Sequence, residues 1–124
     1  MAQYRNTGTP KYALTNKRLI PWLEANLDPF RWVLELTGGE PSLYEGIDEL
    51  VEWLSAHSYR TIIKTNGSNP IQPANGVIRV AAFHQIDNPP KYFDKILIVD
   101  KIGREEKERI CRENGWDYRV IGYN

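Results

Sequence analysis

Short apolar runs that alternate with helix-forming segments are the feature that most limits how this chain can fold. Strands that alternate with helices are joined by right-handed crossovers into a mainly parallel sheet. The pattern therefore predicts an α/β fold with a mainly parallel open sheet of about five strands and helices on its faces. The strand-like runs are 32–36, 60–64, 77–83, 95–99 and 118–121, and the helical patterns are 15–27, 42–54 and 104–114.

The strand-like runs also predict how the sheet is buried. Ile96-Leu97-Ile98 is apolar at every position, which is typical of a parallel strand covered by helices on both faces. We therefore expect adjacent central strands to contain Leu34, Ile62, Val80 and Ile98. In such sheets ligands bind just beyond the carboxyl ends of the strands.

Two helices have recognisable ends. Ser42 precedes Glu45 by three residues, which is the spacing of a capping box, and apolar residues follow at helical intervals. We expect Ser42 to cap this helix. Gly115 lies where a carboxyl-terminal cap is expected after the charged segment 104–114. The charged run 101–112 is interpreted as a solvated helix face.

Length and charge exclude several classes of function. The 124 residues favour a single domain over 1–124, and the sixteen basic and sixteen acidic residues cancel, which disfavours nucleic acid as a partner. No apolar run approaches the roughly 20 residues that span a bilayer, and the first residues do not have the pattern of a secretion signal. We expect a cytoplasmic protein without membrane association.

Two glycine-containing segments follow predicted strands. Thr37-Gly38-Gly39-Glu40-Pro41 combines glycines, which let the backbone approach a ligand, with a carboxylate that can accept hydrogen bonds from an ammonium group. An ordinary turn between a strand and a helix would explain the same residues. The next strand ends in Lys64-Thr65-Asn66-Gly67-Ser68.

In this order and spacing, the two segments resemble motifs of the radical S-adenosylmethionine superfamily. The resemblance is strongest over 33–68 and weakens toward the carboxyl end. It implies part of a partial TIM barrel, in which the glycine motif holds the amino group of the methionine moiety. The residues that the resemblance assigns to a cleft for S-adenosylmethionine or a related nucleoside are Gly38, Gly39, Glu40, Asn66 and His84.

The cysteines that bind the iron–sulfur cluster of that superfamily are missing. The superfamily uses three cysteines in a Cys-x3-Cys-x2-Cys loop, because an iron cluster requires thiolate ligands. Arg5, Thr9 and Tyr12 stand at the matching positions, and the one cysteine, Cys111, lies in a distant predicted helix. We therefore expect no cluster, no other metal and no radical chemistry, while S-adenosylmethionine stays possible as a ligand.

Histidines and aromatic residues offer few other sites. His57 and His84 do not have the spacing of zinc ligands. The aromatic residues of the first third are predicted to be mostly core, although exposed members would be favoured anchors in a protein interface. They are Tyr4, Tyr12, Trp22, Phe30 and Trp32.

Two functions from different classes follow. The preferred hypothesis is a pseudoenzyme, a protein-binding or regulatory module that engages a protein partner or forms a homo-oligomer, and its compactness favours a viral or mobile-element source such as a phage. The alternative is a binder of S-adenosylmethionine or a related nucleoside. A split enzyme that takes its cluster loop from a companion chain is disfavoured, because the segment 5–12 would occupy the place of that loop.

Overall fold

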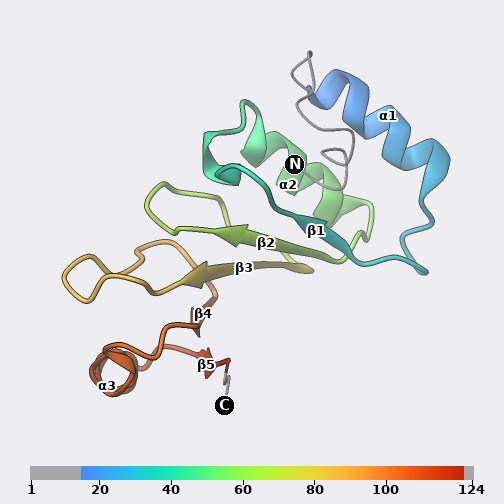
Figure 1. Ribbon diagram of the computed structural model, residues 1–124. Helices are drawn as coiled ribbons and strands as arrows, with labels where there is room; N and C mark the ends of the chain where they lie inside the picture. Colours follow the sequence, from blue (N-terminus) through green and yellow to red (C-terminus); the bar gives the residue numbers. More distant parts are fainter. Residues whose placement is uncertain (1–14, 122–124) are drawn as a thin grey trace.

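The computed structural model describes residues 15–121, in which five strands and three α-helices follow one another along the chain (Figure 1). The expected elements are present, and only the second helix begins well away from its predicted start. The bounds are α1 Asn16–Asn26, β1 Leu34–Leu36, the 3-10 turn η2 Pro41–Leu43, α2 Ile47–Ala56, β2 Thr61–Thr65, β3 Val77–Ala82, β4 Lys95–Ile98, α3 Arg104–Asn114 and β5 Tyr118–Val120.

The five strands form one open, wholly parallel sheet in the order β1-β2-β3-β4-β5, which confirms the predicted α/β class. Every strand therefore pairs with its neighbours in the sequence. Leu36 lies opposite Ile63, and Ala81 lies opposite Ile96. Leu34, Ile62, Val80 and Ile98 fall in four adjacent parallel strands, as predicted, but β1, which contains Leu34, is an edge strand and not a central one.

The helices pack on one face of this sheet. Right-handed crossovers between sequential parallel strands all return on the same side. On that side Leu34 and Ile63 are buried with Leu50 of α2, and Ile96 is buried with Cys111 of α3. Figure 1 shows α1 and α2 lying together over β1 and β2.

The expectation that helices cover both faces is wrong for residues 15–121. Burial alternates along β2, where Thr61 and Ile63 are buried while Ile62 is partly exposed and Lys64 is exposed. Ile78, on the same open face, is 39% exposed. The physical reason is the strand order, because a sheet whose strands follow the sequence receives all its crossovers on one side.

The second helix begins later than its sequence pattern predicts. Ser42 lies in the 3-10 turn, and α2 begins at Ile47 after Gly46, whose φ of 84° is left-handed. Ser42 is therefore not the cap of an α-helix, and the capping-box interpretation is wrong. Leu43, an apolar residue of the predicted helix 42–54, is 73% exposed.

The third helix matches its prediction at both ends. It covers Arg104–Asn114, and Gly115 is its left-handed cap with a φ of 69°. Cys111 is fully buried, and burial raises the pKa of its thiol. The solvated-face interpretation is wrong for Lys107, which is 2% exposed.

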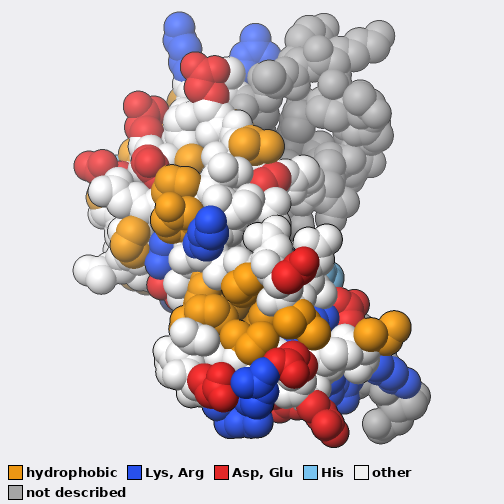
Figure 2. Space-filling model, turned by 90° about the vertical axis from the view of Figure 1, so that its left-hand side faces the viewer, with side chains coloured by type: hydrophobic (Ala, Val, Ile, Leu, Met, Phe, Trp, Pro, Cys, Tyr) orange, Lys and Arg blue, Asp and Glu red, His pale blue; other side chains and the backbone are white. Residues whose placement is uncertain are grey.

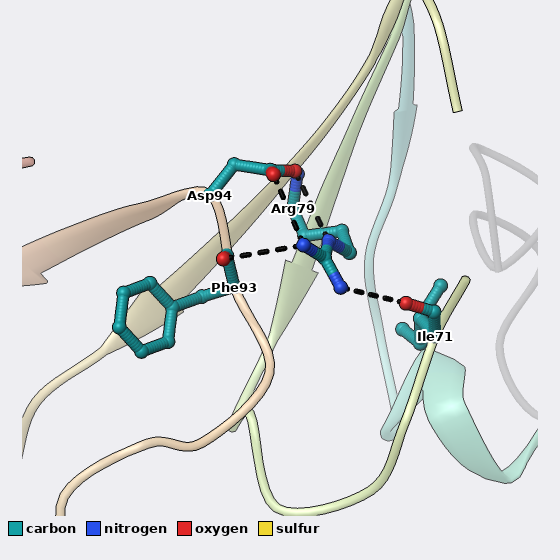
Figure 3. A network of polar contacts seen from close by, with 4 residues as sticks. All are labelled: Ile71, Arg79, Phe93 and Asp94. Atoms are coloured by element: carbon teal, nitrogen blue, oxygen red, sulfur yellow. Dashed lines mark hydrogen bonds and ion pairs between the residues drawn. The ribbon is translucent and has the colours of Figure 1, made fainter. Parts of the chain in front are cut away.

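A buried arginine, Arg79, lies in the central strand β3 and binds the segments on either side of that strand in the sequence (Figure 3). The Nε and Nη2 atoms of Arg79 in β3 each donate to the Asp94 carboxylate at 3.0 Å, Nη1 donates to the Ile71 carbonyl at 2.7 Å, and Nη2 donates to the Phe93 carbonyl at 3.2 Å. Burial raises the pKa of Asp94, but its bonds with Arg79 outweigh burial and hold that pKa below its usual value. Arg79 thus joins the loop before β3 to the segment before β4.

Candidate functional site

The turn after β1 has the backbone that its two glycines predict. Gly38 and Gly39 have φ values of 79° and 54°, in the left-handed region that side-chain-bearing residues rarely adopt. A Cβ added at Gly39 would meet no atom within 4 Å. The glycines are therefore required by the backbone conformation, and at Gly39 the space beside the turn is open.

Glu40 follows this turn, and its carboxylate is held by its own chain. It accepts hydrogen bonds from the Ser42 amide at 2.9 Å, from the Ser42 hydroxyl, from the Thr65 hydroxyl at 2.6 Å and from the Asn66 amide at 2.7 Å. Glu40 thereby caps the 3-10 turn and joins it to the carboxyl end of β2. Glu40, which the sequence singled out only as a ligand-cleft residue, therefore has a structural role.

The electrostatics of Glu40 agree with this geometry. Partial burial raises the pKa of the carboxyl group, but hydrogen bonds from Ser42, Thr65 and Asn66 outweigh it and lower the pKa below its usual value. A carboxylate that is stabilised as an anion by its own chain has fewer lone pairs left for a ligand.

Asn66 and Gly67 complete the second motif. The Asn66 side-chain oxygen accepts from the Ser68 amide at 2.9 Å, which forms a local turn. Gly67 has a φ of 72°, and a Cβ there would lie 2.7 Å from the Pro90 Cβ. The loop after β3 therefore packs closely against the end of β2.

His84 lies beyond the end of β3 in a separate polar cluster. Its Nδ1 is 2.9 Å from Oδ2 of Asp100, which follows β4, and the same oxygen is 3.4 Å from Nζ of Lys107. The hydrogen bond with His84 and the nearby Lys107 ammonium lower the pKa of Asp100. The His84 side chain is 59% exposed, so its ring is open to solvent while one nitrogen is held in place.

The structure thus joins Glu40 and Asn66 through one hydrogen-bond network, which follows the turn formed by Gly38 and Gly39, and it links His84 to other partners. Sequence reasoning placed Thr65 and Asp100 at the carboxyl ends of predicted strands, where ligands bind, but gave neither a role in the site. It did not single out Lys107. Lys107 gave no signal, because it stands among similar charged residues in α3.

Both clusters lie at the end of the sheet where the strands finish, which faces the viewer in Figure 2. Hydrophobic side chains gather in the lower half of this view, above the charged side chains of α3. In the loops after β3 and β4, the large apolar side chains exposed by a third or more are Ile86 at 40%, Tyr92 at 38% and Ile102 at 88%.

Within residues 15–121, no three His, Cys, Asp or Glu side chains are grouped closely enough to hold a metal ion. Arg5, Thr9 and Tyr12, which the sequence resemblance aligned with the cysteines of the superfamily, lie outside the described residues. No helix in the described part of the chain is long and apolar enough to cross a membrane.

Further exposed apolar side chains come from α1 and from the connection that leads to β1, which is an edge strand. We define the aromatic surface as Trp22, Phe30, Trp32 and Val33, which are 53%, 80%, 54% and 51% exposed. The prediction that the aromatic residues of the first third are mostly core is therefore wrong for Trp22, Phe30 and Trp32, because Trp22 lies on the exposed side of α1 and the connection from α1 to β1 is exposed. Tyr4 and Tyr12 lie outside the described residues.

Comparisons with known proteins give no family assignment. No family model matches the chain, and no curated protein or solved structure matches it either. The fold class and the polar clusters therefore rest on the structure alone.

Proposed function

We propose that this protein is a non-catalytic, radical S-adenosylmethionine-like module that binds a protein partner through its aromatic surface. The observation that carries the proposal is the exposure of Trp22, Phe30 and Trp32, each more than half accessible. The superfamily resemblance rests on the two motifs, and a sequential parallel sheet with helices on one side is compatible with part of a barrel.

The size of these side chains favours an interface over chance exposure. A buried aromatic side chain removes about 150–250 Å² from water, and a typical partner surface covers about 800 Å². The three aromatic residues would thus supply a large part of such a surface. Tryptophan is also among the residues that carry most of the energy in measured interfaces.

Several features support a role without catalysis. Cys111 is the chain's one cysteine and is buried, so the chain does not supply thiolates for a cluster. Glu40 is engaged with its own chain. Anaerobic incubation with iron and sulfide should leave the protein colourless, and a stable visible absorption with bound iron would contradict the proposal.

Affinity capture from the native host, together with size-exclusion chromatography, tests the binding role. Trp32→Ala and Phe30→Ala should each reduce partner capture or self-association at least tenfold, as expected for interface anchors worth about 1.4 kcal/mol or more. Leu43→Ala is the matched control, because Leu43 is an exposed apolar residue at the other end of the sheet. A monomer that captures no partner, or variants that bind like the parent, would refute the proposal.

A nucleoside ligand is the second candidate, favoured by the exposed His84 ring beside the ends of β3 and β4. Calorimetric titration with S-adenosylmethionine should then give heat that His84→Ala reduces. Glu40→Ala is a poor test on its own, because it also removes four hydrogen bonds within the chain. Absence of heat, or heat unchanged by His84→Ala, would eliminate this candidate.

A further inference from the structure

A pocket of about 560 Å³ opens at the end of the sheet opposite Glu40. Its lining residues come from around the carboxyl ends of α1 and α2, and these two helix ends lie on the right-hand side of Figure 1. Residues 24–29 form one wall, and Trp53, His57 and Tyr59 form the other. The volume lies within the range of about 300–1,000 Å³ that is typical of ligand sites.

The second wall is aromatic and also offers hydrogen-bond acceptors. The Trp53 ring stacks on His57 at a centroid distance of 4.3 Å and on Tyr59 at 5.4 Å. The Tyr59 hydroxyl donates to the Leu27 carbonyl at 2.8 Å, so its lone pairs remain as acceptors. His57 Nδ1 lies 2.9 Å from the Trp53 carbonyl, and in the neutral ring this leaves Nε2 as an acceptor.

The first wall is negative. It contains the carboxylates of Glu24 and Asp28 and the last residues of α1, whose terminal carbonyls form the negative end of the helix dipole. Burial, followed by the charges of Glu24 and Asp28, raises the pKa of the Tyr59 hydroxyl. No lysine or arginine is among the residues that line the pocket.

These two walls fit a planar cation. A guanidinium group is flat, stacks on aromatic rings and donates in a fork that matches carboxylates and carbonyls. Asp28 and Pro29 also lead directly into Phe30 and Trp32 of the aromatic surface. A protein bound on that surface would therefore pass beside the pocket.

We propose that this pocket receives an arginine side chain of the partner that binds the aromatic surface, an inference that rests on the proposed function. Arg31 is the internal competitor. Its Nε is 3.8 Å from the Asp28 carboxylate, but its side chain is 82% exposed, so this ion pair is weak and can be replaced.

The probe is N-acetyl-arginine amide, followed by nuclear magnetic resonance on the full chain. N-acetyl-citrulline amide, which has the same shape without the charge, is the control. The arginine probe should shift the Trp53 indole signal and the amides of residues 24–28 saturably, with a dissociation constant on the order of millimolar. The citrulline probe should bind much more weakly.

Substitutions of three exposed charged residues test how each charge affects arginine binding. Glu24→Gln and Asp28→Asn should each weaken arginine binding about twofold to fivefold, whereas Arg31→Ala should strengthen it by removing the competitor. Absence of saturable shifts, equal shifts with citrulline, or indifference to these substitutions would overturn the inference.

The outcome is separable from that of the proposed function. Capture of a partner that depends on Trp32 but is not inhibited by arginine amide would uphold the binding role and refute the pocket assignment. Arginine binding in a protein that captures no partner would refute the binding role instead.

Discussion

The Glu40 carboxylate accepts four hydrogen bonds from three residues, and these residues come from both sides of the motif. Ser42 lies after the turn formed by Gly38 and Gly39. Thr65 is the last residue of β2, and Asn66 follows it. One side chain therefore fixes the geometry between β1 and β2 at their carboxyl ends. This makes Glu40 a structural residue irrespective of any ligand.

Glu40→Gln should accordingly destabilise the protein more than Ser42→Ala. The amide replaces an anionic acceptor by a neutral one and brings an NH₂ group toward existing donors, which should cost about 2 kcal/mol. Ser42→Ala removes a smaller share of the network and should cost about 1 kcal/mol. Denaturant midpoints measure both, with the exposed Glu45→Gln as control. The reverse order would mean that the carboxylate is not needed for folding.

The lowered pKa of Glu40 also predicts how stability depends on pH. A carboxyl group with a depressed folded-state pKa stabilises the protein above its unfolded pKa, near its usual value of 4.5, and loses this contribution as the pH falls through the folded value. Stability should therefore fall as the pH is lowered through and below about 4.5. Glu40→Gln should show a shallower fall in unfolding free energy. Parallel curves for the two proteins would argue against an ionised Glu40 in the fold.

The residue types of the candidate site were predictable from sequence, but their partners were not. The motif indicated that a carboxylate and a tight turn belong together. It did not indicate that Thr65, 25 residues away, would donate to that carboxylate. Such bonds depend on the register of β1 against β2, which is fixed only when the sheet forms.

The elements follow local chemistry wherever local signals agree. α3 begins and ends where its charged pattern and Gly115 predict. α2 differs because a capping box and the actual start at Gly46 compete within a few residues, and the bonds of Glu40 favour a 3-10 turn over an early helix. Helix boundaries are sensitive to such tertiary contacts.

Two glycines in the connecting turns should respond differently to the same substitution. Gly39→Ala adds strain from a φ of 54° but meets no atom, so it should cost about 1 kcal/mol. Gly67→Ala adds similar strain and a 2.7 Å contact with Pro90, so it should cost roughly 2–4 kcal/mol. Thermal or denaturant unfolding of the two variants compares them directly. Equal losses would mean that the loop around Pro90 relaxes freely.

At the scale of the whole fold, the core of residues 15–121 has two parts beneath one face of the sheet. The larger cluster joins α1 and α2 to β1 and β2, and the smaller one joins Phe83 and β4 to α3. The parallel class was predictable from the alternation of elements. The sequential strand order and the open second face were not, because strand order depends on contacts between distant segments.

Arg79 lies between these two clusters and should couple them. It donates to the carbonyl of Ile71, which belongs to the larger cluster, and to that of Phe93, which packs against the smaller one. Replacing it leaves buried acceptors without a donor. Arg79→Met should therefore cost about 3 kcal/mol, a large share of the 5–15 kcal/mol that is typical of a domain.

The part of the chain in which Arg79→Met lowers protection against hydrogen exchange tests the coupling of the two clusters more directly than the total loss of stability does. Native-state hydrogen exchange should show that protection in β4, α3 and β5 falls more than protection in β1 and α2, because the smaller cluster loses its connection to the larger one. Asp94→Asn is the milder control, since the Asp94 side chain is 36% exposed and the Arg79 bonds to both carbonyls can persist. A uniform loss of protection along the chain after Arg79→Met would mean that the two clusters already unfold as one unit, and that Arg79 contributes to stability without coupling them.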